Sequence, residues 1–368
     1  MIATLTESKR LPYVFGPEDR SFLAYLQARL RVRLTRKLRR AEYERLLGMN
    51  IDQIAHALSE GSYGEEARSL GAELAGGRLV RAMIRNRLQT EVRQLRHMAR
   101  ECPPAMDWIV CYSWKYDLSR LRGALRGRRV GADLLDGVLS PLLNLPWDVY
   151  REVAHGNPLD ESSPAFAAVK GSPFADTVAL ALSPQPPAED GIEVALLHGY
   201  YNNCLAPMMA STPPDSPARE VLENEVHVLN LLTMLSSSTL NASVEETLIQ
   251  IIPHGAWADE ERVRALLASS TAGQLARALR REKGLGILAR LPVTATDDLT
   301  AGDVERAARR ALAQLTWRAG RITPATPAGL IAYITALELE ARNLAAGVSG
   351  ILGEIPPPEV RTMLVLGS

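Results

Sequence analysis

The segment TPAGLIAYITALELEARNLAAGVSG, residues 326–350, decides the fold class predicted for this chain. Its apolar side chains recur at alternating intervals of four and three positions, which places them on one face of an α-helix. They are Leu330, Ile334, Leu337, Ala341, Leu344 and Val348. Glu338 and Arg342 lie one turn apart in the order that favours an ion pair. The segment therefore predicts a long amphipathic helix.

Proline and glycine set the expected ends of this helix. Thr326 followed by Pro327 suits a helix start, because the first helical residue has no use for the N–H that proline lacks. Gly350 and Gly353, followed by the prolines at 356–358, predict that the helix stops there.

The segment AYLQARLRVRLTRKLRR, residues 24–40, has the same periodicity. Gly16 and Pro17 predict a helix start, and leucines then share one side of a single amphipathic helix. These are Leu23, Leu26, Leu30, Leu34 and Leu38. A basic edge runs beside them, formed by Arg29, Arg33, Arg36 and Arg40. We interpret this edge as a solvated helix face with Glu42 and Glu44 as nearby partners.

Helical periodicity dominates the rest of the chain as well. Proline-rich stretches at 183–191 and 208–220 predict loops between helices, because proline cannot continue an interior helical turn. Short apolar runs such as 177–183 could form strands, but they are too few for a sheet. The sequence therefore predicts an all-α fold.

Composition excludes several classes of protein. The chain has 368 residues, 46% of them apolar, and its 42 basic residues balance its 42 acidic ones. A protein that grips phosphates along a nucleic acid usually has a basic excess, so we do not expect a nucleic-acid partner. The three cysteines are odd in number and widely spaced, a pattern that fits neither a disulfide framework nor a zinc site. No signal peptide or long apolar span is evident, so we expect a cytoplasmic protein without a membrane span of its own.

A degenerate repeat runs through the chain. Glu225 and Glu338 are each followed five positions later by Asn-Leu, at Asn230 and Asn343. A third copy begins at Lys115, where Arg120 replaces the asparagine. The three copies lie about 110 residues apart, roughly the size of one small domain. Positions five apart on a helix point to different sides, so the two members of each pair should contact different neighbours. We interpret the repeat as three related helical domains.

No constellation of reactive residues emerges from the sequence. Phosphate-binding loops, zinc-protease motifs and nucleophile elbows are all missing, and the six histidines are scattered. The best catalytic candidate is the run Asp297, Asp298 and Asp303, because clustered aspartates can hold magnesium against a diphosphate. Asp303 precedes a predicted helix, however, and helix capping explains it better. We therefore expect no catalytic residue, no metal and no cofactor.

The opening of the chain resembles the C subunit family of V/A-type ATPases and ATP synthases, the counterpart of the d subunit of eukaryotic vacuolar ATPases. That family begins approximately with Tyr-Leu-x-Ala-Arg-x-Arg, then leucine-rich helices, then Tyr-Gly. The residues in register here are Tyr25, Leu26, Ala28, Arg29, Arg31 and Arg33, then Tyr43, then Tyr63 and Gly64.

The repeat strengthens this resemblance. The family carries a Glu/Asp…Asn-[Ile/Leu] signature near the end of each of three helical domains, which corresponds here to Asp117–Leu121, Glu225–Leu231 and Glu338–Leu344. Tyr333 matches an early tyrosine of the family's closing helix. Arg120 departs from the signature, the first twenty residues have no counterpart, and the resemblance is weak through 131–215.

The resemblance implies a funnel-like arrangement of three similar helical domains around a pseudo-threefold axis. We expect an N-terminal extension at 1–20 and domains at 21–130, 131–237 and 238–368. The candidates for family-motif or interface residues are Tyr25, Arg29, Arg31, Arg33, Tyr63, Gly64, Asp117, Arg120, Glu225, Asn230, Tyr333, Glu338 and Asn343. The three opening arginines could pair with acidic residues between domains or meet acidic groups on a partner.

The resemblance also implies a function without chemistry of its own. The protein would sit on the ring of membrane proteolipids, receive the central rotor shaft with its D-type and F-type subunits, and pass torque between them. We expect it at the cytoplasmic side of the membrane as part of an ATPase complex. Two alternatives stay open: a helical scaffold of an unrelated complex, and a magnesium-dependent enzyme that uses the aspartates near residue 300.

Overall fold

Helices form the secondary structure wherever the computed structural model describes the chain, and no strand occurs in that part. The described residues are 15–70, 74–130, 144–157, 159–183, 185–186, 189–239, 242–269, 271–291, 299–322 and 326–366. The predicted all-α fold is confirmed for these residues. The apolar run at 177–183, considered as a possible strand, lies largely in helix α9 (Ala175–Ala181).

The described residues divide into two units, which are treated separately below. Residues 15–117, 144 and 320–366 form the terminal unit, and residues 118–130 and 145–319 form the middle unit. Helices α6 (Pro103–Val130) and α16 (Ala301–Ile322) each continue from one unit into the other. The expected division into three domains is not tested by these units and stays a prediction.

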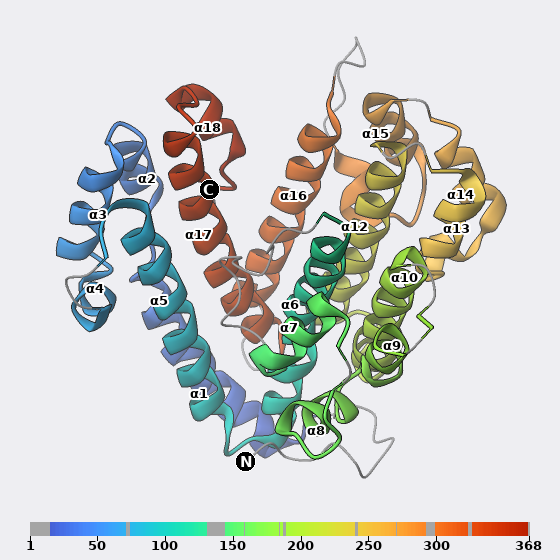
Figure 1. Ribbon diagram of the computed structural model, residues 1–368, viewed down its shortest axis with the longest axis horizontal. Helices are drawn as coiled ribbons and strands as arrows, with labels where there is room; N and C mark the ends of the chain where they lie inside the picture. Colours follow the sequence, from blue (N-terminus) through green and yellow to red (C-terminus); the bar gives the residue numbers. More distant parts are fainter. Residues whose placement is uncertain are drawn as a thin grey trace. The chain divides into compact units, whose positions relative to one another are not determined.

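The terminal unit is built around the long helices α1, α5 and α17 (Figure 1). Helices α1 and α5 both pack against α17, α3 and α4 pack on α5, and α18 packs on α17. Besides its parts of α6 and α16, its helices are α1 (Pro17–Leu34), α2 (Arg40–Leu46), α3 (Ile51–Glu60), α4 (Gly64–Leu70), α5 (Gly76–Ala99), α17 (Ala328–Leu352) and α18 (Pro357–Met363).

Helix α17 follows the predicted pattern closely. Pro327 is its N-cap, and all six apolar positions of the four-three spacing are buried. Gly353 follows the last helical residue, as expected. Gly350 does not stop the helix, contrary to the prediction, because the helix continues to Leu352. Its missing side chain instead gives room to Val360 of α18, since a Cβ at Gly350 would lie 2.4 Å from Val360 Cγ2.

The opening segment is not the single helix that the sequence predicted. Helix α1 begins at Pro17 as expected but ends at Leu34, and α2 begins at Arg40. The Thr35 hydroxyl folds back to the carbonyl of Val32 at 2.7 Å. The Leu38 N–H donates to the Glu340 carboxylate of α17 at 3.0 Å, so a tertiary hydrogen bond replaces a helical one. Of the five leucines, Leu23, Leu26 and Leu30 are buried, whereas the last two are half-buried.

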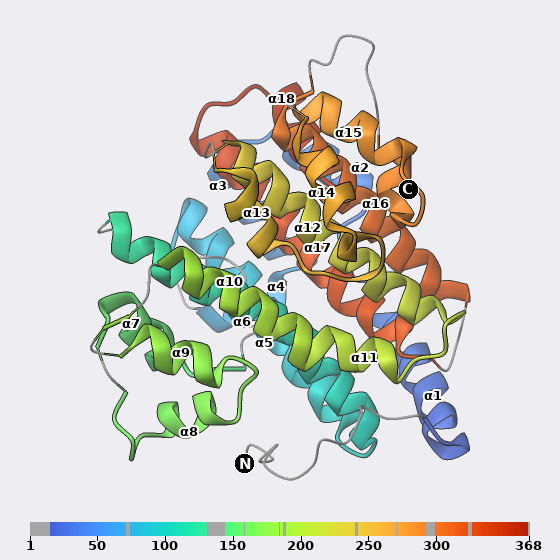
Figure 2. The same ribbon diagram turned by 90° about the vertical axis from the view of Figure 1, so that its right-hand side faces the viewer.

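The middle unit is an array of shorter helices around α12 (Figure 2). Helix α12 contacts α11, α13 and η4, while α9 packs on α10 and α14 lies between α13 and α15. Besides its parts of α6 and α16, its helices are α7 (Trp147–His155), α8 (Pro164–Lys170), α9, α10 (Glu189–Tyr200), η2 (Tyr201–Leu205), α11 (Ala206–Ala210), α12 (Pro217–Thr239), α13 (Val244–Gln250), η3 (Gly255–Ala258), α14 (Glu260–Leu267), α15 (Ala272–Arg281) and η4 (Gly286–Arg290).

Helices α10, η2 and α11 form one continuous run in which a proline is accommodated (Figure 2). Segment η2 is a π-helical turn that directly precedes Ala206 and Pro207. Pro207 has no N–H to donate into an α-helical ladder, and the wider π turn before it lets the helix pass this position.

Helix α16 begins with a reciprocal cap that accounts for one of the aspartates considered as metal ligands. The Thr300 N–H and hydroxyl donate to Asp303 Oδ2 at 2.9 and 2.6 Å, and the Asp303 N–H donates back to the Thr300 hydroxyl at 3.2 Å. Asp303 is thus a capping residue, as the sequence favoured. Asp297 and Asp298 lie outside the described residues.

The contact between Gly350 and Val360 yields the first prediction. Replacing a helical glycine by alanine normally stabilises a protein by up to about 1 kcal/mol. At Gly350 we expect the opposite, a loss of about 1–3 kcal/mol, because the new methyl group must push α18 away. Denaturant titration of Gly350→Ala measures this change in the free energy of unfolding.

Gly347→Ala on the same helix is the matched control, because nothing lies within 4 Å of a Cβ there. We expect it to be neutral or stabilising. Combining Gly350→Ala with Val360→Ala should recover part of the loss. Equal effects of the two glycine substitutions would show that the α17–α18 contact does not constrain position 350.

Candidate functional site

The two asparagines of the repeat use their side-chain amides in the same way. Asn230 Nδ2 donates to the carbonyl of Ile252 at 2.9 Å, and its Oδ1 accepts from the Ile252 N–H at 2.8 Å. Asn343 binds Val365 identically, at 3.0 and 2.9 Å. In both repeats the bound residue lies 22 positions downstream. We call these pairs the asparagine brackets, because each amide holds a later, non-helical segment of backbone by both its polar groups.

The first copy of the repeat holds a later segment by other chemistry. Within the terminal unit, the Asp117 carboxylate accepts from the Asn144 N–H at 2.9 Å and from Asn144 Nδ2 at 3.0 Å. Within the middle unit, the guanidinium of Arg120 lies 4.8 Å from the ring centroid of Trp147, a cation–π contact. The departure at Arg120 therefore changes the kind of contact made.

A further repeat position emerges three residues before each asparagine or its arginine replacement. Asp117 occupies it in the first copy, His227 in the second and Glu340 in the third. All three are buried, and each accepts a hydrogen bond from a residue distant in the chain. Of the three, only Asp117 was a candidate from the sequence. The signal that could have identified His227 and Glu340 is a polar residue at the same position of every copy, within an otherwise apolar helix face.

The flanking positions of the repeat also behave alike. Leu121, Leu231 and Leu344, which follow the bracket position, are all buried. Glu338 pairs with Lys115 at 3.2 Å and with Arg342 at 2.9 Å, and it accepts from the Tyr116 hydroxyl at 2.8 Å. Since Asn343 binds Val365 instead, the two members of this copy contact different neighbours, as predicted.

Within the terminal unit, Glu91 of α5 collects partners from two other helices. Arg33 of α1 donates to both carboxylate oxygens, at 2.7 and 3.0 Å, and the Tyr333 hydroxyl of α17 donates to one of them. Burial alone would raise the pKa of Glu91, but the hydrogen bonds from Arg33 and Tyr333 and nearby positive charge outweigh it, so the pKa is lowered. Glu91 is therefore an ionised carboxylate that ties α1, α5 and α17 together.

Glu340 of α17 is the second buried carboxylate, with its side chain 4% exposed. The Tyr63 hydroxyl donates to it at 2.7 Å, and Arg87 of α5 lies 3.8 Å away. Lys37 lies beside this group and donates to the carbonyl of Ala336. Burial, together with the charge of Arg87, lowers the pKa of Lys37 to about 8 despite the opposing effect of Glu340.

The remaining candidates from the opening motif have different surroundings. Arg29 lies over the ring of Tyr25, 5.7 Å from its centroid, and the Tyr25 side chain is exposed. Arg31 donates to the carbonyl of Arg321 at 3.2 Å. Gly64 begins α4, where a Cβ would lie 2.8 Å from the carbonyl of Ser59. Of the three opening arginines, Arg33 forms the ion pair just described.

The candidates do not gather into one site. Arg120, Glu225 and Asn230 belong to the middle unit, and the others belong to the terminal unit. Glu225 is buried in α12. Among the described residues, no three His, Cys, Asp or Glu side chains are grouped so that they could hold a metal ion. None of the helices in the described ranges has the length and apolar content that a membrane crossing requires.

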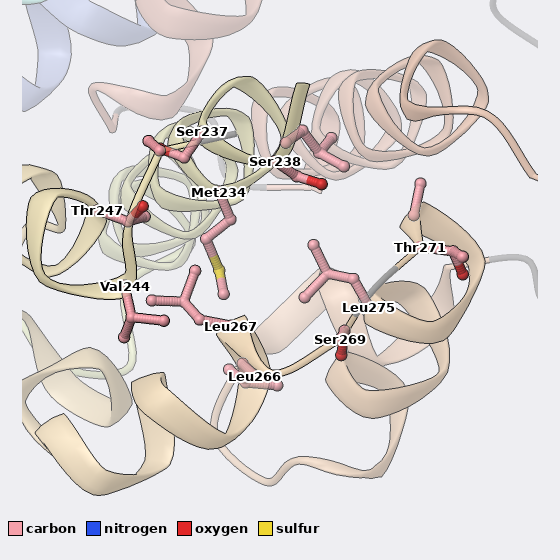
Figure 3. A pocket seen from close by; sticks show the side chains of 13 residues that line it. Met234, Ser237, Ser238, Val244, Thr247, Leu266, Leu267, Ser269, Thr271 and Leu275 are labelled. Atoms are coloured by element: carbon pink, nitrogen blue, oxygen red, sulfur yellow. The ribbon is translucent and has the colours of Figure 1, made fainter. Parts of the chain in front are cut away.

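The middle unit has a pocket of about 90 Å³ at the C-terminal end of α12 (Figure 3). Met234, Leu267 and Leu275 point toward one another across it, and hydroxyl groups lie around them (Figure 3). These come from Ser237, Ser238, Thr247, Ser269 and Thr271. The described residues that line this pocket are apolar or carry hydroxyl groups, and none of them is titratable, so the lining suits a small apolar group.

Fold and site together define a repeat-built helical protein in which polar side chains hold distant segments of the chain. A sequence model of the family described as "ATP synthase (C/AC39) subunit" matches residues 26–363. The chain belongs to this family, a group of rotary ATPase subunits.

Individual relatives agree with this assignment. The chain is 24% identical over 350 residues to a Haloferax volcanii protein named as the C subunit of an A-type ATP synthase, covering 93% of this chain and 97% of the relative. It is 24% identical over 256 residues to a protein of the same name from Archaeoglobus fulgidus, covering 68% and 71%. A third relative of that name, from Methanosarcina acetivorans, is 30% identical over 122 residues, 32% of this chain and 33% of the relative.

The asparagine brackets yield the second prediction. Asn230→Leu keeps the approximate size of the side chain but leaves the N–H of fully buried Ile252 without the partner it has in Asn230. The Ile252 carbonyl loses one of two hydrogen bonds, because the His254 N–H also donates to it at 2.9 Å. An unpaired buried group costs about 1–3 kcal/mol, so we expect a loss of about 1–3 kcal/mol in the free energy of unfolding. Asn343→Leu should cost less, because Val365 is partly exposed. Denaturant titrations of both variants test this order, and a reversed order would contradict it.

His227 yields the third prediction. Its Nδ1 accepts from Trp257 Nε1 at 2.8 Å, and burial followed by the charge of His254 lowers its pKa to about 4 from 6.5. Between these values the unfolded chain binds a proton that the folded chain does not, so stability falls as the pH falls from about 6.5 to about 4. The full effect is about 3 kcal/mol.

His227→Gln is the matched control, since glutamine keeps an acceptor but does not titrate. We expect the difference in unfolding free energy between the unmodified protein and this variant to change with pH over that window and to be constant above about pH 7.5. Parallel pH profiles of the two proteins would show that His227 does not resist protonation.

Proposed function

We propose that this chain is a non-catalytic central-stalk adaptor of a rotary V/A-type ATPase or ATP synthase. In this role it receives the rotor shaft, with its D-type and F-type subunits, and passes torque to the membrane proteolipid ring. It acts at the cytoplasmic face of the membrane, as a peripheral part of the complex, and carries out no chemistry itself.

One observation carries this proposal: the similarity to a protein named as the C subunit of an A-type ATP synthase extends over 93% of the chain. A match of this extent includes the terminal and the middle units alike. A scaffold of an unrelated complex that shared only one domain with the family would not match over both units.

The internal contacts support a mechanical role. An adaptor for torque needs a body that resists shear between its helices, and packed interiors with fixed polar contacts provide stiffness. In the terminal unit, Glu91 and Glu340 each join helices that are far apart in sequence. The asparagine brackets fix irregular segments in the same way.

The repeat supports the proposed three-domain architecture around a pseudo-threefold axis. Its copies place equivalent polar residues at 117, 227 and 340, and each of these side chains holds a distant segment. Equivalent contacts at regular spacing are expected if three domains descend from one ancestral unit.

Tagged protein, released gently from its native membranes, tests the function. We expect nucleotide-binding head subunits, shaft subunits and proteolipid to co-purify with it, and the isolated chain to hydrolyse no ATP. Recovery of none of these subunits, under conditions in which the ATPase itself stays intact, would contradict the proposal.

The fourth prediction concerns the outward face of α1, where Tyr25, Arg29 and Val32 lie on one side. The exposed fractions of Tyr25 and Val32 are 58% and 66%, an unusual apolar exposure that suits an interface with another protein. We expect Val32→Glu to weaken co-purification with the shaft or ring by about ten-fold or more without affecting folding.

Ile249→Glu on α13 is the matched control, since this side chain has the same exposed fraction of 66%. We expect it to leave co-purification unchanged. Unaltered assembly of the Val32→Glu variant would remove α1 from the interface while leaving the adaptor function untouched.

A further inference from the structure

Helix α5 of the terminal unit has an outward face with a single sign of charge. Every exposed residue of this helix is basic or neutral and polar: Arg78, Arg81, Arg85, Gln89, Arg93 and His97. The intervals of three and four positions keep these residues on one side. We call the four arginines the α5 arginine row. From Arg78 to Arg93 the row is about 22 Å long, at 1.5 Å per helical residue.

The described residues do not neutralise this row by ion pairs. None of its four arginines makes a hydrogen bond or ion pair with any other described residue. The acidic residues of the neighbouring helix α4, Glu65 and Glu66, make no ion pair with the row either. Arg100, just beyond α5, is different, because it lies 3.8 Å from Glu101. With respect to the described residues, the row is thus a patch of unpaired positive charge on a chain whose net charge is zero.

The first arginine of the row is placed unfavourably on its helix. Arg78 lies in the first turn of α5, where the helix dipole is positive, and no acidic residue occupies that turn. Cations are stabilising at the opposite end. A row of four exposed arginines that has no ion pair with the described residues, and whose first member opposes the helix dipole, points to an external anion.

The chemistry of the row narrows the kind of partner. Its exposed residues include no apolar or aromatic side chain, so it lacks the dehydrated centre around which protein interfaces form. The outward face of α1 differs in this respect, because Tyr25 and Val32 are exposed there. Arginine binds phosphate oxygens through two parallel N–H groups, and a line of such groups fits a surface of many phosphates.

We propose that the α5 arginine row is a contact surface for an anionic lipid bilayer, made through the headgroup phosphates. The inference rests on the proposed function in one respect, which is that this function places the chain beside a membrane-embedded ring. Basic clusters on helices are attracted to anionic leaflets within about a Debye length. Such a contact is reversible, and it concentrates the free protein at the membrane before it joins the complex.

Vesicle binding by the purified full chain tests the proposal. We expect co-sedimentation with vesicles that contain roughly one-third phosphatidylglycerol, little with pure phosphatidylcholine, and loss of binding between about 0.05 and about 0.5 M salt. The double substitution Arg81→Glu and Arg85→Glu should weaken binding by about ten-fold or more. Circular dichroism and thermal unfolding establish that the variants are folded.

The matched control is the pair Arg281→Glu and Arg290→Glu, which changes the net charge equally at arginines of the middle unit. Binding by this control should stay close to that of the unmodified chain. An equal loss in both double variants, or no binding to phosphatidylglycerol vesicles at low salt, would overturn the proposal.

Co-purification of the same variants with the ATPase separates this inference from the proposed function. We expect the Arg81→Glu, Arg85→Glu variant to assemble with the ATPase when enough of the variant protein is present. If it binds vesicles normally but no longer assembles, the row contacts an acidic protein surface and the lipid proposal is wrong. Failure of the unmodified chain to co-purify with any part of an ATPase would instead contradict the adaptor function.

Discussion

Two carboxylates that are largely withdrawn from water determine how the terminal unit is held together. A buried charge is costly unless hydrogen bonds and opposite charges replace its hydration. Glu91 obtains them from Arg33 and Tyr333, and Glu340 from Tyr63 and the N–H of Leu38. These partners are separated from the glutamates by up to 302 positions in the chain. An arrangement that separated these helices would leave both carboxylates buried without these partners, so the two carboxylates favour the observed geometry.

The asparagine brackets apply the same principle to backbone groups. The segments around Ile252 and Val365 are not helical, so their N–H groups find no helical acceptor and need another partner. One amide satisfies both groups without introducing a charge. In the adaptor role proposed here, the carboxylates would resist movement of helices relative to one another. The amides would resist movement of the non-helical segments relative to the helices.

Much of this organisation could be predicted from the sequence, and the exceptions have physical causes. The helices and the buried apolar face of α17 follow from local periodicity, which is visible in the sequence alone. The break at Thr35 could not be predicted, because it depends on a hydrogen bond from Leu38 to a residue at the far end of the chain. Gly350 was misinterpreted for the same reason, since its role is to admit Val360. The repeat revealed Asn230 and Asn343 but not their bound residues, and nothing local identified Glu91 as the partner of Arg33.

The equal separation within the two asparagine brackets has a consequence for the evolution of the chain. Because one amide must reach one particular peptide group, the separation of 22 positions between each asparagine and its bound residue is constrained. The exposed residues between the two ends can change their side chains as long as the chain covers the same path, whereas buried positions such as Gly350 and Val360 stay constrained by packing. An inserted or deleted residue, in contrast, would present the neighbouring peptide group with the wrong orientation. Drift in composition at exposed positions, with conservation of length, is therefore the form of divergence that this architecture tolerates in those two spans.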